Sequence, residues 1–144
     1  MYPPVSHWAW DGTGWLNQLA YQDYAGSGAV HVLSGVCALV GCIAIGARKG
    51  RFDADGKPVE IPGHSLPLAA LGGFILLFGF LAFNGGSQSA IAGAEDAAAV
   101  TTSVLNTIFG GVGGGLLVLF AYKFGLGGKW SYMFCLNGTL AGKE

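Results

Sequence analysis

The stretch from Tyr24 to Ala47 constrains this chain most, because among its 24 residues only His31 has a readily ionisable side chain. A helix of that length rises about 36 Å, enough to cross a hydrocarbon core of about 30 Å. Asp23 precedes the run, where a carboxylate can accept hydrogen bonds from the free N–H groups of a helix start. His31 lies about 12 Å further along the axis. An ionisable side chain at that depth points to function, so we predict a membrane helix that presents His31 to an interior path.

The composition is that of an integral membrane protein. Of 144 residues, 52% are hydrophobic and 10% are charged, against roughly 25% charged in soluble domains. So little charge cannot solvate a globular surface. The formal net charge of −1 gives no reason to expect a nucleic acid as partner.

Two further apolar runs have the length of membrane spans. With the first they predict an all-α, polytopic transmembrane helix bundle formed by residues 1–144 as part of a single membrane domain. A fourth run begins near Trp130 and is too short to cross. The expected spans are 24–47, 66–83 and 97–120.

The loop 48–64 fixes the predicted orientation. It holds four of the seven basic residues, which places it on the cytoplasmic side by the positive-inside rule. The connection 84–96 carries Glu95 and Asp96 and no base, which fits the outer side.

Small residues predict close helix packing within the third span. Gly110 and Gly114 are four residues apart, as are Gly111 and Gly115, a spacing that lets helices cross closely. The three cysteines lack the spacing of a metal site. We expect them to behave as small apolar residues, and we expect no cofactor.

The first 22 residues are expected to be the end of one element followed by a loop. Pro3 and Pro4 disfavour a helix interior there, and residues 11–14 form a turn cluster. The tryptophans of this segment suit a membrane–water interface.

Several motifs resemble the ammonium transporter (Amt/MEP) family. The strongest is Asp-Tyr-Ala-Gly-Ser-Gly-Ala-Val-His at residues 23–31. Others follow in the family's order at 46–52, 83–87, 128–131 and 136–138. The family generally has eleven spans built as two inverted halves. The resemblance therefore implies a segment from the end of the fourth span to the start of the eighth.

The resemblance implies transport of ammonium or ammonia through a hydrophobic pore in the plasma membrane. Asp23 is similar to a buried acid that supports the outer site, and His31 to the first pore histidine. Phe83 is similar to a pore-gating phenylalanine, and Ser87 to the hydroxyl of the outer recruitment site. Trp10 fits the tryptophan of that site, with Trp8 as the alternative match.

Other family features lie outside the chain or differ in it. Phe80 stands where tryptophan is common, and Ala82 where glycine is common. The resemblance implies that the second pore histidine lies in spans beyond this segment. His7 and His64 cannot replace it, since both occupy polar connections. The family also implies a homotrimer for the full-length protein.

The predicted topology supports the same function independently of the family resemblance. It places Trp10, Phe83 and Ser87 near the outer face. Aromatic faces and a hydroxyl there could bind a small cation through cation–π attraction and hydrogen bonding. His31, neutral, offers one donor and one acceptor to a solute deeper in the membrane.

Three alternatives stay open at this point. One is an ammonium sensor of the same fold, signalling through an attached domain. A second is a truncated, non-conducting product. A membrane enzyme is the third and the least favoured, because the spans hold one histidine and no nucleophile–base or multi-ligand metal cluster.

Overall fold

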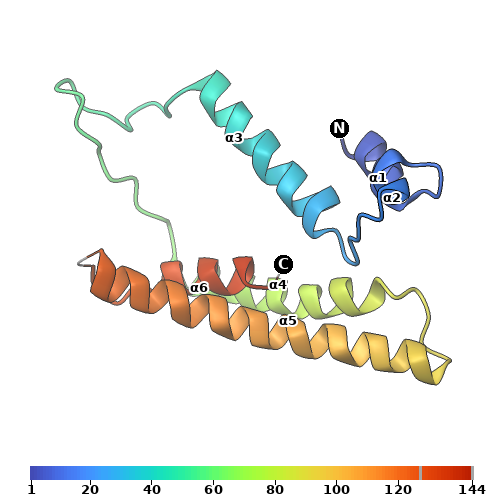
Figure 1. Cartoon of the computed structure of the whole chain (residues 1–144). Coiled ribbons are helices and arrows are strands. Elements are labelled where there is room, and N and C mark those ends of the chain that lie inside the picture. Colours follow the sequence, from blue (N-terminus) through green and yellow to red (C-terminus); the bar gives the residue numbers. More distant parts are fainter. Residues whose placement is uncertain (127, 144) are drawn as a thin grey trace. The chain divides into compact units, whose positions relative to one another are not determined.

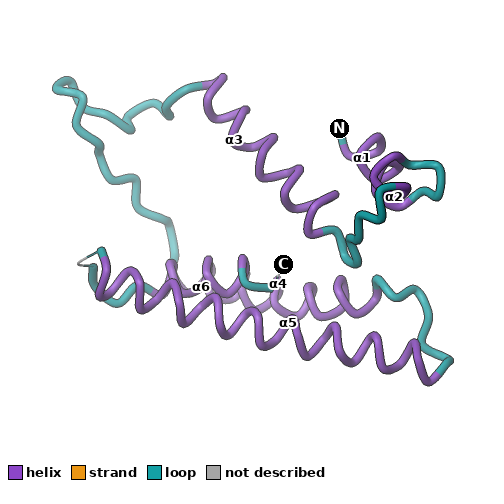
Figure 2. Tube along the Cα trace, in the orientation of Figure 1, coloured by secondary structure: helices purple, strands orange, loops and turns teal. Residues whose placement is uncertain are grey.

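The computed structural model describes residues 1–126 and 128–143, and every regular element in them is a helix (Figures 1 and 2). Three of the helices are long and apolar enough to cross a membrane: Ser27–Ile45, Leu66–Gly86 and Ala94–Gly125. The expected all-α class with three full spans is confirmed. The chain divides into two units, Met1–Leu66 and Pro67–Glu144, and each is described by itself.

The first unit opens with two short helices, α1 (Tyr2–Trp10) and α2 (Trp15–Gln18). The expected end of one element is α1, and the two prolines, which disfavour a helix interior, do not interrupt it. Both prolines fall in the first turn of α1, where a missing N–H costs nothing. A Cβ on Gly14 would overlap the carbonyl groups at the end of α1, so the two helices meet backbone to backbone.

The first apolar helix consists of a π-helical turn, η1 (Ser27–Val32), continued by α3 (Leu33–Ile45). It lies within the expected range 24–47. It begins after Gly26, whose φ of 100° belongs to the left-handed region that favours glycine. It ends at Gly46, at a φ of 80°.

The loop after α3 contains a tight turn built on Asp53. One carboxylate oxygen of Asp53 accepts hydrogen bonds from the backbone N–H groups of Asp55, at 3.0 Å, and Lys57, at 2.8 Å. Phe52 and Pro58 form an isolated bridge across the turn. All of these residues are exposed.

The second unit contains α4 (Leu66–Gly86), α5 (Ala94–Phe120), η2 (Ala121–Gly125) and α6 (Tyr132–Ala141). Helix α4 runs three residues beyond the expected 66–83. Helix α5 starts three residues before the expected 97 and carries Glu95 and Asp96 in its first turn, where acids favour the helix dipole. Helix α6 lies along α5 (Figure 1).

Glycines make the contact between α5 and α6. A Cβ on Gly110 would overlap the carbonyl oxygen of Gly142, and one on Gly114 would overlap that of Gly138. Conversely, a Cβ on Gly138 would lie 2.6 Å from the carbonyl oxygen of Gly114. The predicted close crossing is confirmed, and Gly138 of α6 and Gly142 at its C-cap form a matching pair at the same four-residue spacing.

The three apolar helices are largely uncovered within this chain. In their most apolar windows, 6%, 6% and 17% of the residues are buried. Such surfaces suit lipid or further membrane helices.

Candidate functional site

Asp23 organises the start of the first apolar helix. One of its carboxylate oxygens accepts from the backbone N–H of Gly26 at 2.6 Å. The other accepts from Gly28 at 3.0 Å and Ala29 at 2.7 Å. The residue in the N-cap position is Gly26, yet Asp23 satisfies the free N–H groups as expected of a capping carboxylate. Charge-assisted bonds of this kind are the stronger class.

Two aromatic residues hold Asp23 in place. The indole Nε1 of Trp10 donates to the backbone carbonyl of Asp23 at 2.6 Å. The Tyr21 hydroxyl bonds the Asp23 carboxylate, and it sits where a side chain on Gly28 would otherwise lie. Desolvation, and secondly the negative charge of Asp23, raise the pKa of Tyr21 above its usual value near 10. Tyr21 therefore stays a protonated donor at neutral pH.

His31 lies in the π-helical turn that follows. Its backbone N–H donates to the carbonyl of Gly26, five residues back, at 3.0 Å. Such turns are rare and are frequent at functional sites. The imidazole is half-buried, with Nε2 shielded from solvent. Trp10 also approaches this turn, its ring 3.7 Å from where a Gly26 Cβ would stand, whereas Trp8 packs on Trp15.

The second unit brings Phe83 and Ser87 together at the end of α4. The hydroxyl of Ser87, in the turn directly after α4, donates to the Phe83 carbonyl at 2.8 Å. The four-residue spacing places Ser87 one turn beyond Phe83 on the same side of the helix axis. Phe80 lies a turn below, its ring centroid 6.2 Å from that of Phe83. Phe83 is 45% exposed, so part of its surface is available to a solute or another helix.

A buried polar contact beside Phe83 was not expected from the sequence. Asn84 is 7% exposed and donates from Nδ2 to the Thr107 hydroxyl on α5 at 2.9 Å. The same nitrogen lies 3.2 Å from the backbone carbonyl of Lys143. The Lys143 ammonium nitrogen lies 4.7 Å from the ring centroid of Phe80. A lone amide within an apolar run was the available signal, since such groups seek partners on neighbouring helices.

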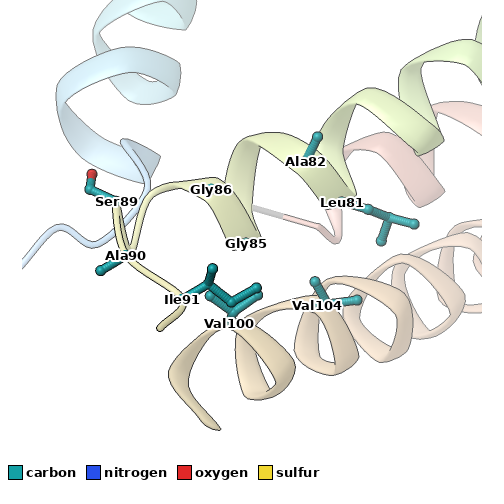
Figure 3. A pocket seen from close by; sticks show the side chains of 9 residues that line it. All are labelled: Leu81, Ala82, Gly85, Gly86, Ser89, Ala90, Ile91, Val100 and Val104. Atoms are coloured by element: carbon teal, nitrogen blue, oxygen red, sulfur yellow. The ribbon is translucent and has the colours of Figure 1, made fainter. Parts of the chain in front are cut away.

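A pocket of about 450 Å³ lies next to this contact (Figure 3). The end of α4, the following connection and the first turns of α5 line it, and the walls are apolar except at Ser89. None of the expected site residues lines it. Its lining residues are Leu81, Ala82, Gly85, Gly86, Ser89, Ala90, Ile91, Val100 and Val104.

The expected site residues thus fall into two groups. Trp10, Asp23 and His31 are joined in the first unit, and Phe83 and Ser87 in the second. Across the described residues, no three His, Cys, Asp or Glu side chains lie close enough to hold a metal ion.

Comparison with known proteins shows which family the chain is similar to. Residues 1–143 match the Ammonium Transporter Family. The chain is 40% identical to a putative ammonium transporter 1 of Caenorhabditis elegans over 99% of its own length and 28% of the relative's. It is 43% identical to the ammonium transporter Amt1 of Methanocaldococcus jannaschii over 81% of its length and 30% of the relative's.

Solved structures agree. A Mep2 mutant (delta442) from Candida albicans superimposes with a TM-score of 0.75 at 33% identity, over 99% of this chain and 31% of that one. The chain therefore spans about 30% of the length of the relatives it matches. The family match covers nearly every residue and the helices follow a solved member's course, so the chain belongs to the ammonium transporter family.

Proposed function

We propose that this chain is part of a pathway that conducts ammonium or ammonia across the cell membrane. The observation that carries the proposal is the helix start at residues 23–31. There a capped, π-helical turn holds His31 within an apolar helix, close to a tryptophan tethered to the same turn. The relatives named as ammonium transporters supply the substrate.

His31 provides the chemistry inside the membrane. A neutral imidazole can accept from, or donate to, a small nitrogen solute. Ammonium can donate to the acceptor nitrogen of the imidazole, and ammonia can also accept from its N–H. The apolar walls of the pathway disfavour a bare charge and so favour the deprotonated form. Transport here is passage through a pore, with no covalent step.

The outer recruitment site combines aromatic faces with a hydroxyl. Trp10 supports this role better than Trp8, because Trp10 is bonded to the turn that carries His31 while Trp8 packs on Trp15. Phe83 and Ser87 share one helix face, which suits a gate beside a hydrogen-bonding group. Cation–π contacts of this kind contribute about 0.5–2 kcal/mol each.

The rest of the pathway, including a second pore histidine, comes from outside this segment in this proposal. Residues 1–144 then form part of one membrane domain, and the full-length protein assembles as a homotrimer. The uncovered apolar faces of the three spans are consistent with both.

The test is a chimera in which residues 1–143 replace the matching segment of the C. elegans relative. It is expressed in cells that lack their own ammonium transporters, and uptake of labelled methylammonium is measured per molecule at the surface. We expect uptake well above that of cells expressing no transporter. A chimera that reaches the surface and conducts nothing would contradict the proposal.

A further inference from the structure

The buried contact of Asn84 joins α4 to two other parts of the second unit. Its Nδ2 donates to the Thr107 hydroxyl at 2.9 Å and to the Lys143 carbonyl at 3.2 Å. Thr107 in turn donates to the carbonyl of Ser103 at 2.8 Å. Asn84 and Thr107 are 7% and 3% exposed, so water does not compete for these bonds.

This contact matters because burial of apolar surface alone does little to fix the rotation of α4 about its own axis. Apart from Asn84, the helix is apolar on all its faces, so hydrophobic burial hardly distinguishes one rotation from another. An amide in an apolar environment is costly to leave without partners. Gly85 allows the close approach, since a Cβ there would lie 3.0 Å from the Val104 side chain. The bond to Thr107 therefore selects one rotation.

The selected rotation determines where Phe83 and Ser87 point. Phe83 precedes Asn84 directly, and Ser87 follows Phe83 by one turn on the same face. Each residue step turns an α-helix by 100°. Slippage of α4 by one residue would thus carry the phenyl ring and the hydroxyl well away from their present direction.

We propose that Asn84 is a positioning residue, which places the Phe83 ring and the Ser87 hydroxyl by clamping α4 to Thr107. It does not contact the permeating solute. The inference rests on the proposed function, because it concerns the recruitment site that Ser87 and Phe83 are proposed to form.

The experiment uses the chimera defined above and a matched pair of variants. Thr107→Val keeps the shape of the side chain and removes the hydroxyl, while Thr107→Ser retains the hydroxyl. We expect Asn84→Ala and Thr107→Val to raise the half-saturating methylammonium concentration about fivefold or more per surface molecule. Thr107→Ser should stay within twofold of the parent. Equal behaviour of the Val and Ser variants would overturn the proposal.

A double variant separates positioning from general damage to the fold. If Asn84 acts through Ser87, Asn84→Ala should add little to the defect already caused by Ser87→Ala. Defects that multiply in the double variant would refute the proposed route. Thr107→Val is nearly isosteric. The comparison of Thr107→Val with Thr107→Ser therefore still decides the question if Asn84→Ala fails to reach the surface.

A third measurement does not depend on transport. Cysteines introduced at Leu81 on α4 and Val104 on α5, which line the same pocket, should be joined readily by a short thiol cross-linker in isolated membranes. We expect Thr107→Val to slow that cross-linking and Thr107→Ser to leave it unchanged. A chimera that cross-links in this manner but does not conduct would refute the proposed function and leave the clamp intact. Unchanged cross-linking in Thr107→Val would refute the clamp.

Discussion

The indole N–H of Trp10 donates a hydrogen bond of 2.6 Å to the backbone carbonyl of Asp23. This bond ties the end of α1 to the residue whose carboxylate starts the first membrane helix. The Trp10 hydrogen bond and the hydrogen bonds of the Asp23 carboxylate therefore act on the same turn, and that turn carries His31. The geometry of the first unit depends on this short segment more than on any apolar core, since only Ala9 and Ala29 are buried apolar residues in the described chain.

Removing the Asp23 carboxylate should loosen the start of the helix. It accepts three backbone hydrogen bonds, so we expect Asp23→Ala to lower the free energy of unfolding by about 3 kcal/mol. Asp23→Asn keeps one acceptor oxygen and should cost less. The measurement is denaturant unfolding of the 144-residue chain in mixed micelles.

Asp53→Ala is the matched control for that prediction. Asp53 also accepts backbone hydrogen bonds, but in an exposed loop, so the loss there should be about 1 kcal/mol or less. Equal losses for the two variants would contradict a special role for Asp23.

Tyr21 should titrate above its usual pKa near 10. The protonated hydroxyl bonds Asp23, so its contribution to stability is complete below pH 10 and is lost as the pH rises through the raised pKa. NMR titration of labelled tyrosine, assigned by Tyr21→Phe, measures the midpoint. A midpoint at or below 10 would disprove the contact with Asp23. Tyr21→Phe should also lower stability at pH 7, by about 1 kcal/mol.

The topology predicted from charge places the loop 48–64 inside and the connection 84–96 outside. A cysteine at Lys57 should therefore react with an impermeant thiol reagent only after the membrane is opened. A cysteine at Ile91 should react in intact cells. The parent background has its own three cysteines replaced by alanine. The reverse labelling pattern would show the opposite orientation, with the Asp23 end of the first span inside.

Gly113 and Gly114 provide a sharp comparison of packing on α5. A Cβ on Gly114 would overlap the carbonyl of Gly138, whereas nothing lies within 4 Å of one on Gly113. In the 144-residue chain, Gly114→Val should speed amide hydrogen exchange throughout α6 by tenfold or more, because the helix pair opens more often. Gly113→Val should leave the exchange rates nearly unchanged. Similar rates for the two variants would mean that the glycine contact does not hold α6 to α5.

The sequence was sufficient for those parts of the fold that depend on apolar length and small-residue spacing. The three long helices and the close packing at Gly110 and Gly114 follow from features within single segments. The end of one element within the first 22 residues was predictable, but the length of α1 was not, because Pro3 and Pro4 disfavour a helix interior yet are tolerated in a first turn. Local rules of this kind depend on where the helix begins.

The details of the site could not be predicted from the sequence, because they depend on the three-dimensional structure. The π-helical turn at His31 arises from the left-handed Gly26 together with the Asp23 cap, and no periodicity in the sequence signals it. The partner of Asn84 is 23 residues away on another helix. The sequence shows that a polar group lies in an apolar run, but the choice of Thr107 depends on how the two helices pack.

The His31→Leu variant of the chimera is the most direct test of the account. Leucine keeps an apolar side chain of similar volume and removes both hydrogen-bonding nitrogens. We predict that methylammonium uptake per surface molecule falls at least tenfold, with surface expression close to that of the parent. Cys37→Ala, on the same helix, should leave uptake within twofold. Normal uptake by well-expressed His31→Leu would show that the histidine is only a packing residue and would contradict the proposed pathway.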